Sequence, residues 1–581
     1  MPGTFHVDGE ASAQRHPLAL SSEKKAVLKD LALSLSIANL CFLFIWLEVL
    51  NLAGDDTFRY YEAQPPGFDL VGALILDISA VGVVLFASFR ARRAQRAPLK
   101  WTAAGVIAFF SMFALYQLQR SITDYMMDRV IFTTLFICKL IIAAVAGILL
   151  LWSLAQHFRR SPKRFLRELP NRLARVGSAV FVVLFPLFPL LMANAVIRYE
   201  SIGAPLFRDH SPAPMLTAKA DTPRVIWIIF DEMDMRMAFE APPQRINLRE
   251  FNRLKNQAIF GARVITPNRN TTPSMNSLLL GVQITEFNQQ TRELLFKTAA
   301  CSHWQRFSSH ANVFSRAREA GFNTGLSGWH HPYCRLIAQD LNDCAWVENP
   351  WYTWKRYLQP ISFWQKAESL IDRQARHVPG ARNIFGIDAE SDALQEYCSH
   401  DISALRTVLA NGYRMLRDPH LNLVLIHLPI PHPPGIWDAR RGVFVTTGNS
   451  NYIDNLQLSD MVLGQIRRVL EQSGEWDRSA ILVSSDHPYR VAAWQFAGPD
   501  VDLRSEEVAY FSQMRQQPYV PFLLKLPNQK SPVSYDREFN SVITADLLLA
   551  LLKKELTTTT EVIQWVNAHA TDSLTFASSC R

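Results

Sequence analysis

Residues 225–232 read Val-Ile-Trp-Ile-Ile-Phe-Asp-Glu, six apolar residues that end in two carboxylates. A short run of β-branched and aromatic residues predicts a fully buried strand, here 224–230. Four similar runs follow, at 258–265, 422–428, 480–484 and 521–526. Helical periodicity occupies stretches between and after them, at 247–256, 310–320, 401–416, 455–472 and 541–553. This alternation predicts an α/β domain in which helices cover both faces of a mixed sheet.

Polar residues follow three of these strands directly. Asp231 and Glu232 follow the first, Asp486 and His487 follow the run at 480–484, and His432 lies just beyond 422–428. In α/β sheets, sites form at the carboxyl ends of the strands. Each feature taken alone also fits a turn or a helix cap. Together they indicate a divalent-metal site with oxygen and nitrogen ligands.

A segment rich in threonine and asparagine, 268–274, precedes a predicted helix start. It contains Thr271 and Thr272. A hydroxyl at a helix N-terminus beside a metal ion is an activated nucleophile, because the helix dipole and the ion both favour the alkoxide. The sequence therefore offers a nucleophile for the metal site.

The amino-terminal third of the chain is of a different kind. Five apolar stretches are long enough to span a bilayer, at 31–50, 70–89, 101–118, 131–154 and 176–197. We expect a cytoplasmic tail (1–30), a five-span domain (31–197), a linker (198–221) and an outer domain (222–581). Basic residues gather in the tail and in the second and fourth connections. Because basic loops stay cytoplasmic, the amino terminus is predicted inside and the outer domain outside.

The same distribution explains the formal net charge of +8. The excess lies in the three basic segments, so the outer domain has no basic surplus with which to grip nucleic acid. Two charged residues, Asp77 and Lys139, lie within predicted spans. A mutual ion pair and a role in handling a lipid head group both fit them.

Five of the seven cysteines fall in the outer domain, which the topology places in an oxidising compartment. There is no CxxC pair, so a zinc knuckle is not expected. Cys334 and Cys344 are the nearest candidates for a disulfide, and Cys580 is expected to be a free thiol.

The order of these motifs resembles the alkaline phosphatase/sulfatase superfamily. More narrowly, it resembles the membrane-anchored branch of lipid A phosphoethanolamine transferases, lipoteichoic acid synthases and phosphoglycerol transferases. The resemblance covers about residues 222–553 and rests on the following segments: 225–232, 271–281, 321–331, 427–434, 484–487 and 521–527. In this register Thr271 stands at the nucleophile position. The chain departs from the sulfatase pattern at Met275, where that pattern has arginine, and at 488–490, where it has Gly-Glu.

The resemblance implies a sulfatase-like outer domain with zinc or manganese. The residues implied as metal ligands are Asp231, Glu232, Thr271, Asp486 and His487. Thr271 would attack the phosphorus of a phospholipid head group. His432 would protonate the departing diacylglycerol oxygen and then activate the acceptor, while His331 and Arg490 would bind substrate.

The implied protein is a transferase of the cytoplasmic (inner) membrane that works in the periplasm. It would move phosphoethanolamine or phosphoglycerol to a glycolipid or glycan of the cell envelope. A phosphodiesterase or phosphatase of the same superfamily is one alternative, and a catalytically degenerate membrane scaffold is another. A threonine nucleophile excludes formylglycine chemistry at this position.

Overall fold

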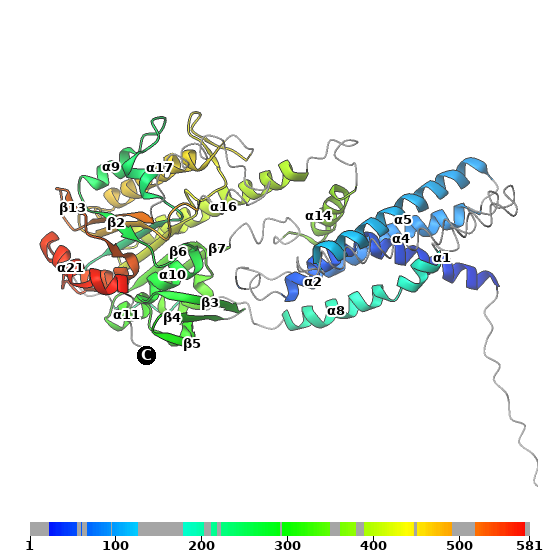
Figure 1. Ribbon diagram of the computed structural model, residues 1–581, viewed down its shortest axis with the longest axis horizontal. Helices are drawn as coiled ribbons and strands as arrows, with labels where there is room; N and C mark the ends of the chain where they lie inside the picture. Colours follow the sequence, from blue (N-terminus) through cyan, green and yellow to red (C-terminus); the bar gives the residue numbers. More distant parts are fainter. Residues whose placement is uncertain are drawn as a thin grey trace, which may run out of the picture. The chain divides into compact units, whose positions relative to one another are not determined.

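The structure is a computed structural model that describes residues 22–54, 60, 67–93, 96–125, 178–202, 211–217, 222–290, 293–348, 361–378, 389–446, 450–490 and 518–575. Contacts divide the chain into two units. The first contains residues 1–50 and 72–196, drawn from blue to cyan in Figure 1. The second, which we call the outer unit, contains residues 51–71 and 197–581.

A mixed nine-stranded sheet forms the centre of the outer unit in the part that the structure describes. The strand order is β13-β2-β12-β11-β1-β8-β6-β7, and β14 pairs with β2. Strand β1 (Val225–Phe230) runs parallel to both β11 (Ala480–Ser485) and β8 (Leu423–Leu428). Parallel strands β6 (Thr324–His330) and β7 (Asp343–Glu348) follow β8. On the other side lie β12 (Tyr519–Lys525), β2 (Ile259–Ile265), β13 (Val533–Tyr535) and β14 (Phe539–Asn540).

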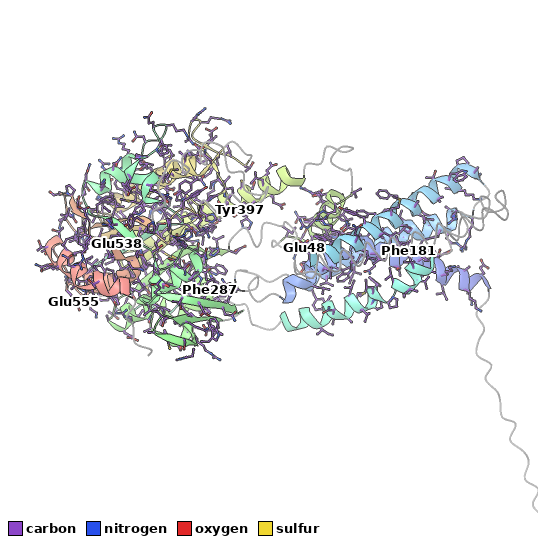
Figure 2. The ribbon with its side chains drawn as sticks, in the orientation of Figure 1. Glu48, Phe181, Phe287, Tyr397, Glu538 and Glu555 are labelled. Carbon is purple, nitrogen blue, oxygen red and sulfur yellow. A yellow bond between two sulfur atoms is a disulfide. The ribbon has the colours of Figure 1, made fainter. Side chains whose placement is uncertain are left out.

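The side chains of β1 alternate between two hydrophobic cores because successive residues of a strand point to opposite faces. Trp227 packs in one core with helices α10 (Thr271–Leu280), α11 (Val313–Glu319), α20 (Thr544–Leu552) and α21 (Thr559–Thr575). Ile228 packs in the other with α9 (Arg249–Lys255), α16 (Ala389–Arg417) and α17 (Tyr452–Gln472). Figure 2 draws the side chains of both units as sticks over the ribbon. The α/β arrangement predicted from the sequence is confirmed.

All five predicted strands and all five predicted helices are present, but the sequence did not predict several others. Strands β6 and β7 are among them, as are helix α14 (Phe363–Arg376) and the small antiparallel sheet β3 (Ile284–Gln290), β4 (Glu293–Thr298) and β5 (Cys301–Arg306). Strand β6 contains Gly325 and Gly328, which weaken a strand signal. Packing requires them: a Cβ on Gly328 would lie 2.5 Å from a ring carbon of Tyr333.

The first unit contains apolar helices. Among the described residues, three helices are long and apolar enough to cross a membrane by length and composition. They are Phe68–Ala91 (α4), Ala97–Ser121 within α5 (Ala97–Tyr125) and Ser178–Ile197, which overlaps α8 (Leu187–Ile202). They contain three of the predicted spans almost entirely. The first predicted span is instead a pair of helices, α1 (Ser22–Cys41) and α2 (Leu43–Gly54), with a bend of 60° between them. The fourth predicted span and Lys139 lie outside the described residues, and Asp77 is buried in α4.

An ion pair within the first unit links two of the segments predicted to be cytoplasmic. The Arg93 guanidinium donates to the Asp30 carboxylate at 2.7 Å. Asp30 ends the predicted tail, and Arg93 belongs to the basic second connection. The pair brings these two segments together, and the orientation of the chain in a membrane stays a prediction.

The predicted disulfide between Cys334 and Cys344 is present, with a Cα–Cα separation of 5.7 Å. It ties the short helix α12 (Tyr333–Leu336), which follows β6, to β7. Cys301 is also disulfide-bonded, and Cys398 is a buried free thiol. Cys580 lies outside the described residues.

Replacement of Arg224 by methionine is expected to destabilise the outer unit by about 3 kcal/mol. This buried guanidinium donates to the carbonyl oxygens of Met415, Leu416 and Asp418 at the end of α16. Methionine keeps much of the volume but removes the donor that these three carbonyl oxygens share. Urea-dependent proteolysis of the full chain in detergent measures the loss.

The matched control is Arg441→Met. Arg441 is 70% exposed, and its ion pair with Asp438 is long, at 3.9 Å. We expect the control to change stability by less than about 0.5 kcal/mol. Equal effects of the two variants would contradict the role of Arg224 at the end of α16.

Candidate metal centre

The parallel register of β1 and β11 brings two carboxylates to the same sheet edge. Phe230 pairs with Ser485, so Asp231 and Asp486 leave adjacent strands side by side. Thr271 reaches the same edge as the first residue of α10. Asp231 and Asp486 are fully buried, and Thr271 is 6% exposed. The structure thus brings together residues that are 40 and more positions apart in the sequence.

Four side chains converge at this edge, and we call them the metal cluster: Asp231, Thr271, Asp486 and His487. His487 Nε2 lies 3.6 Å from Asp231 Oδ1 and 3.4 Å from Asp486 Oδ2. Thr271 Oγ1 lies 3.2 Å from His487 Nε2 and 3.4 Å from Asp231 Oδ2. Ligands placed 2.0–2.1 Å from a tetrahedral ion are roughly 3.4 Å apart. The spacing of the cluster is that of an ion's ligand set.

The hydrogen bond made by the other ring nitrogen fixes the tautomer of His487. Its Nδ1 lies 3.0 Å from the carbonyl oxygen of Pro488, which can only accept, so Nδ1 carries the proton. Nε2 therefore presents a lone pair to the cluster. Burial, with a contribution from the nearby Arg490, lowers the pKa of His487 to about 3. The imidazole is neutral, which is the form that binds metals.

The two carboxylates carry oxygens that the protein leaves unpaired. Within the part of the chain that the structure describes, Asp231 Oδ1 and Asp486 Oδ2 are buried and have no hydrogen-bond partner. Burial raises the pKa of Asp486 to about 7, and it raises the pKa of Asp231 well above its usual range with help from the charges of Asp486 and Glu232. Unpaired buried oxygens are costly without a cation. These residues fit a divalent ion.

Backbone and side-chain donors hold the remaining carboxylate oxygens in place. Asp486 Oδ1 accepts from the backbone N–H groups of Glu232 and His487, at 3.0 and 2.9 Å. Asp231 Oδ2 accepts from the indole Nε1 of Trp329 at 3.1 Å. Such bonds orient metal ligands and leave the other oxygen directed to the ion.

Glu232 and His432 form a neighbouring group at the same edge. His432 Nε2 lies 3.6 Å from Glu232 Oε2, and the ligand atoms of Asp231, Glu232 and His432 lie within 4.8 Å of one another. Glu232 has a φ of 64°, a left-handed conformation that is strained for a glutamate. His432 Nδ1 donates to the carbonyl of Pro433, so its Nε2 also carries a lone pair.

The structure separates the two adjacent histidines at the end of β6. His330 Nε2 lies 3.2 Å from Thr272 Oγ1, beside the predicted nucleophile. His331, which we predicted as a substrate ligand, is fully buried, and its Nδ1 contacts the hydroxyl of Tyr60 at 3.1 Å. His331 is therefore not brought to the metal cluster, and its binding of substrate stays a prediction. Thr272 therefore contacts His330, whereas Thr271 contacts Asp231 and His487 in the metal cluster.

Sequence reasoning missed three residues that support the site. Trp329 lies within segment 321–331 of the resemblance but was not predicted as a site residue. Tyr333 contacts His427 Nδ1 at 2.8 Å, and His427 Nε2 lies 3.7 Å from Asp231 Oδ2 beneath the cluster. His427 could have been recognised by its position, because it is the penultimate residue of a buried strand and a buried histidine needs polar partners.

Ion binding is expected to weaken as the pH falls below about 7. The raised pKa of Asp486 means that a proton competes for this ligand below that pH, whereas the proton is absent above it. Below that pKa, one competing proton lowers the affinity for the ion by about tenfold per pH unit. Competition with a chelator for Zn²⁺ or Mn²⁺, measured with the full chain across this range, provides the test.

Asp460 offers a matched control. Burial raises its pKa to about 6, and it accepts from two backbone N–H groups at the start of α9, outside the metal cluster. Asp460→Asn should leave the pH dependence unchanged, and Asp486→Asn should abolish tight binding. A pH-independent affinity would contradict the role of Asp486.

No family model and no curated protein matches the chain. Among solved structures, it is similar to a protein in the alkaline phosphatase superfamily from Vibrio parahaemolyticus, with 10% identity and a TM-score of 0.33 over 58% of this chain and 68% of that one. The phosphonate monoester hydrolase of Agrobacterium radiobacter has 14% identity and a TM-score of 0.34, over 57% and 74%.

Murine ectonucleotide pyrophosphatase/phosphodiesterase 5 in complex with AMP has 11% identity and a TM-score of 0.31, over 57% and 95%. By their names, two of these solved structures are a phosphonate monoester hydrolase and a pyrophosphatase/phosphodiesterase. The resemblance to membrane-anchored transferases rests on sequence motifs alone.

Proposed function

We propose that the outer unit is a metal-dependent phosphotransferase that takes a phospholipid head group onto Thr271 and passes it to an acceptor of the cell envelope. The observation that carries the proposal is the convergence of the Thr271 hydroxyl with the unpaired oxygens of Asp231 and Asp486. These oxygens and His487 Nε2 would hold a divalent ion. When bound, the ion lowers the pKa of a nearby hydroxyl and stabilises charge on phosphoryl oxygens.

Thr271 is the nucleophile in this proposal. It begins a ten-residue helix, where the dipole favours negative charge on its oxygen. In the first half-reaction its Oγ bonds to phosphorus and the bond from phosphorus to the glycerol oxygen breaks. The threonine proton is lost to solvent, and the glycerol oxygen takes up a proton to leave as diacylglycerol. The product is a phosphodiester on Thr271.

His432 acts in the second half-reaction. The acceptor hydroxyl bonds to phosphorus, its proton passes to His432 Nε2, and the bond from phosphorus to Thr271 breaks. The Thr271 oxygen takes up a proton to become the hydroxyl again, and His432 releases its proton to solvent. Burial and Arg490 lower the pKa of His432 to about 3, so the free side chain is neutral with its lone pair on Nε2. Its protonation of the leaving diacylglycerol, which the resemblance implies, would require a proton that this tautomer lacks. We therefore assign it the role of base.

A lipid donor is supported by the apolar helices of the same chain, three of which could cross a membrane. The disulfide between Cys334 and Cys344 favours an oxidising compartment for the outer unit. With the basic tail and connections, it supports a cytoplasmic amino terminus and a periplasmic catalytic domain. The head group proposed is phosphoethanolamine or phosphoglycerol, and the acceptor is a glycolipid or glycan.

Thr271→Ala is expected to lower diacylglycerol release by about 10³-fold or more, because it removes the nucleophile. The full chain in detergent would be mixed with Mn²⁺ or Zn²⁺ and with vesicles of phosphatidylethanolamine and phosphatidylglycerol. Diacylglycerol is quantified, and peptide mass spectrometry locates the adduct and identifies the head group by its mass.

Thr272→Ala serves as the matched variant, since Thr272 contacts His330 and not the cluster. It should keep the adduct on Thr271. An adduct on Thr272 would overturn the assignment of the nucleophile. Continuous release of the head group to water, with no transfer to an added envelope fraction, would replace the transferase with a hydrolase.

A further inference from the structure

Arg490 is bound to Glu232 through both its main chain and its side chain. The backbone N–H of Arg490 donates to Glu232 Oε1 at 2.7 Å. Its Nε donates to the same oxygen and its Nη2 to Glu232 Oε2, both at 3.2 Å. This is the two-point pairing of a guanidinium with a carboxylate, the strongest form of such an ion pair.

The same guanidinium reaches the two other groups around it. Nη2 donates toward His432 Nε2 at 3.4 Å, and Nη1 donates to Asn270 Oδ1 at 3.2 Å. Asn270 immediately precedes Thr271. Arg490 thus faces the ligand atoms of Glu232 and His432, which would otherwise be available with Asp231 for a second ion.

We propose that the Arg490 guanidinium is a built-in cation that takes the place of a second metal ion, so that this site holds a single ion. The proposal deepens the proposed function and rests on its metal cluster. Glu232, which we predicted as a metal ligand, becomes the counter-ion of Arg490. Arg490, which we predicted to bind substrate, becomes a positioning residue for Glu232 and His432.

The charges at the sheet edge support a single ion. Three carboxylates, those of Asp231, Glu232 and Asp486, are fully buried at this edge, and that of Glu232 is paired with Arg490. A divalent ion and one guanidinium balance the three negative charges. A second divalent ion would leave two uncompensated positive charges in a buried site beside Arg490, which is unfavourable at these distances.

A fixed guanidinium differs from a second ion in its chemistry. A guanidinium keeps its charge at all working pH values. It cannot be removed by a chelator. It also positions the imidazole of His432, and the acceptor hydroxyl would take its place at Nε2 when His432 acts as the base.

The test is the metal content of Arg490→Met in the full chain. Methionine removes the charge and the donors while it keeps much of the stem's volume. Proteins purified in detergent would be saturated with Zn²⁺, freed of excess ion by gel filtration and analysed by mass spectrometry of the metal. We expect the variant to hold about one ion more per chain than the unmodified protein, because Glu232 and His432 are released as ligands.

Two variants make this gain specific. Arg467→Met removes an equivalent two-point pair, since Arg467 binds both oxygens of Glu250 between α17 and α9. It should leave the metal content unchanged. The double variant Arg490→Met/His432→Ala should lose the additional ion, because only two of the three ligands remain. Near-ultraviolet circular dichroism checks that each variant is folded.

The role of Arg490 is tested by the difference in metal content between Arg490→Met and the unmodified protein. The proposed function is tested by the metal content of the unmodified protein, so the two can fail separately. Asp486→Asn tests the metal cluster itself and should remove the ion already present. If the unmodified protein holds no ion but Arg490→Met holds one, the metal cluster is wrong and the role of Arg490 stands. Two ions in the unmodified protein, or a folded Arg490→Met with no gain, would overturn the role of Arg490.

Discussion

The burial of negative charge at one sheet edge is the constraint on which the outer unit depends. Parallel pairing of β1 with β11 places Asp231 and Asp486 side by side, and both are fully buried. Carboxylates in such a place must be neutralised, paired or bound to a cation. Arg490 pairs with the buried carboxylate of Glu232 at this edge, and the proposed divalent ion would neutralise Asp231 and Asp486. The arrangement of Thr271, His487 and Glu232 follows from that requirement.

The helices on the two faces of the sheet hold the strands that carry the site residues in place. Two separate cores pack against alternate residues of β1, so the end of this strand is held from both sides. Helix α10 then directs its first residue to the edge, while Trp329 and Tyr333 approach from β6 and the turn after it. Sites built on strands and helix ends keep their geometry better than sites on loops, which suits a reaction that depends on precise placement.

Much of the architecture could be predicted because burial patterns are local. The runs of apolar residues located β1, β2, β8, β11 and β12, and the cysteine spacing suggested the disulfide between Cys334 and Cys344. Strand β6 could not be found in this way, because its glycines allow close packing, Gly328 against Tyr333 and Gly325 against Leu421, and do not favour a strand. The bend between α1 and α2 was also missed, since both helices belong to one continuous apolar stretch.

The sequence by itself placed Asp231, Glu232, Asp486 and His487 after predicted strands. With Thr271 at a predicted helix start, it named these five residues as one group of metal ligands. Only the tertiary structure decided what the neighbours do. It turned His331 toward Tyr60 and His330 toward Thr272, although the two are adjacent in the sequence. It also joined Arg490 to Glu232 across 258 positions. The reason is physical: strand position sets the edge at which a residue lies, whereas pairing among buried charges depends on distances that only the folded chain defines.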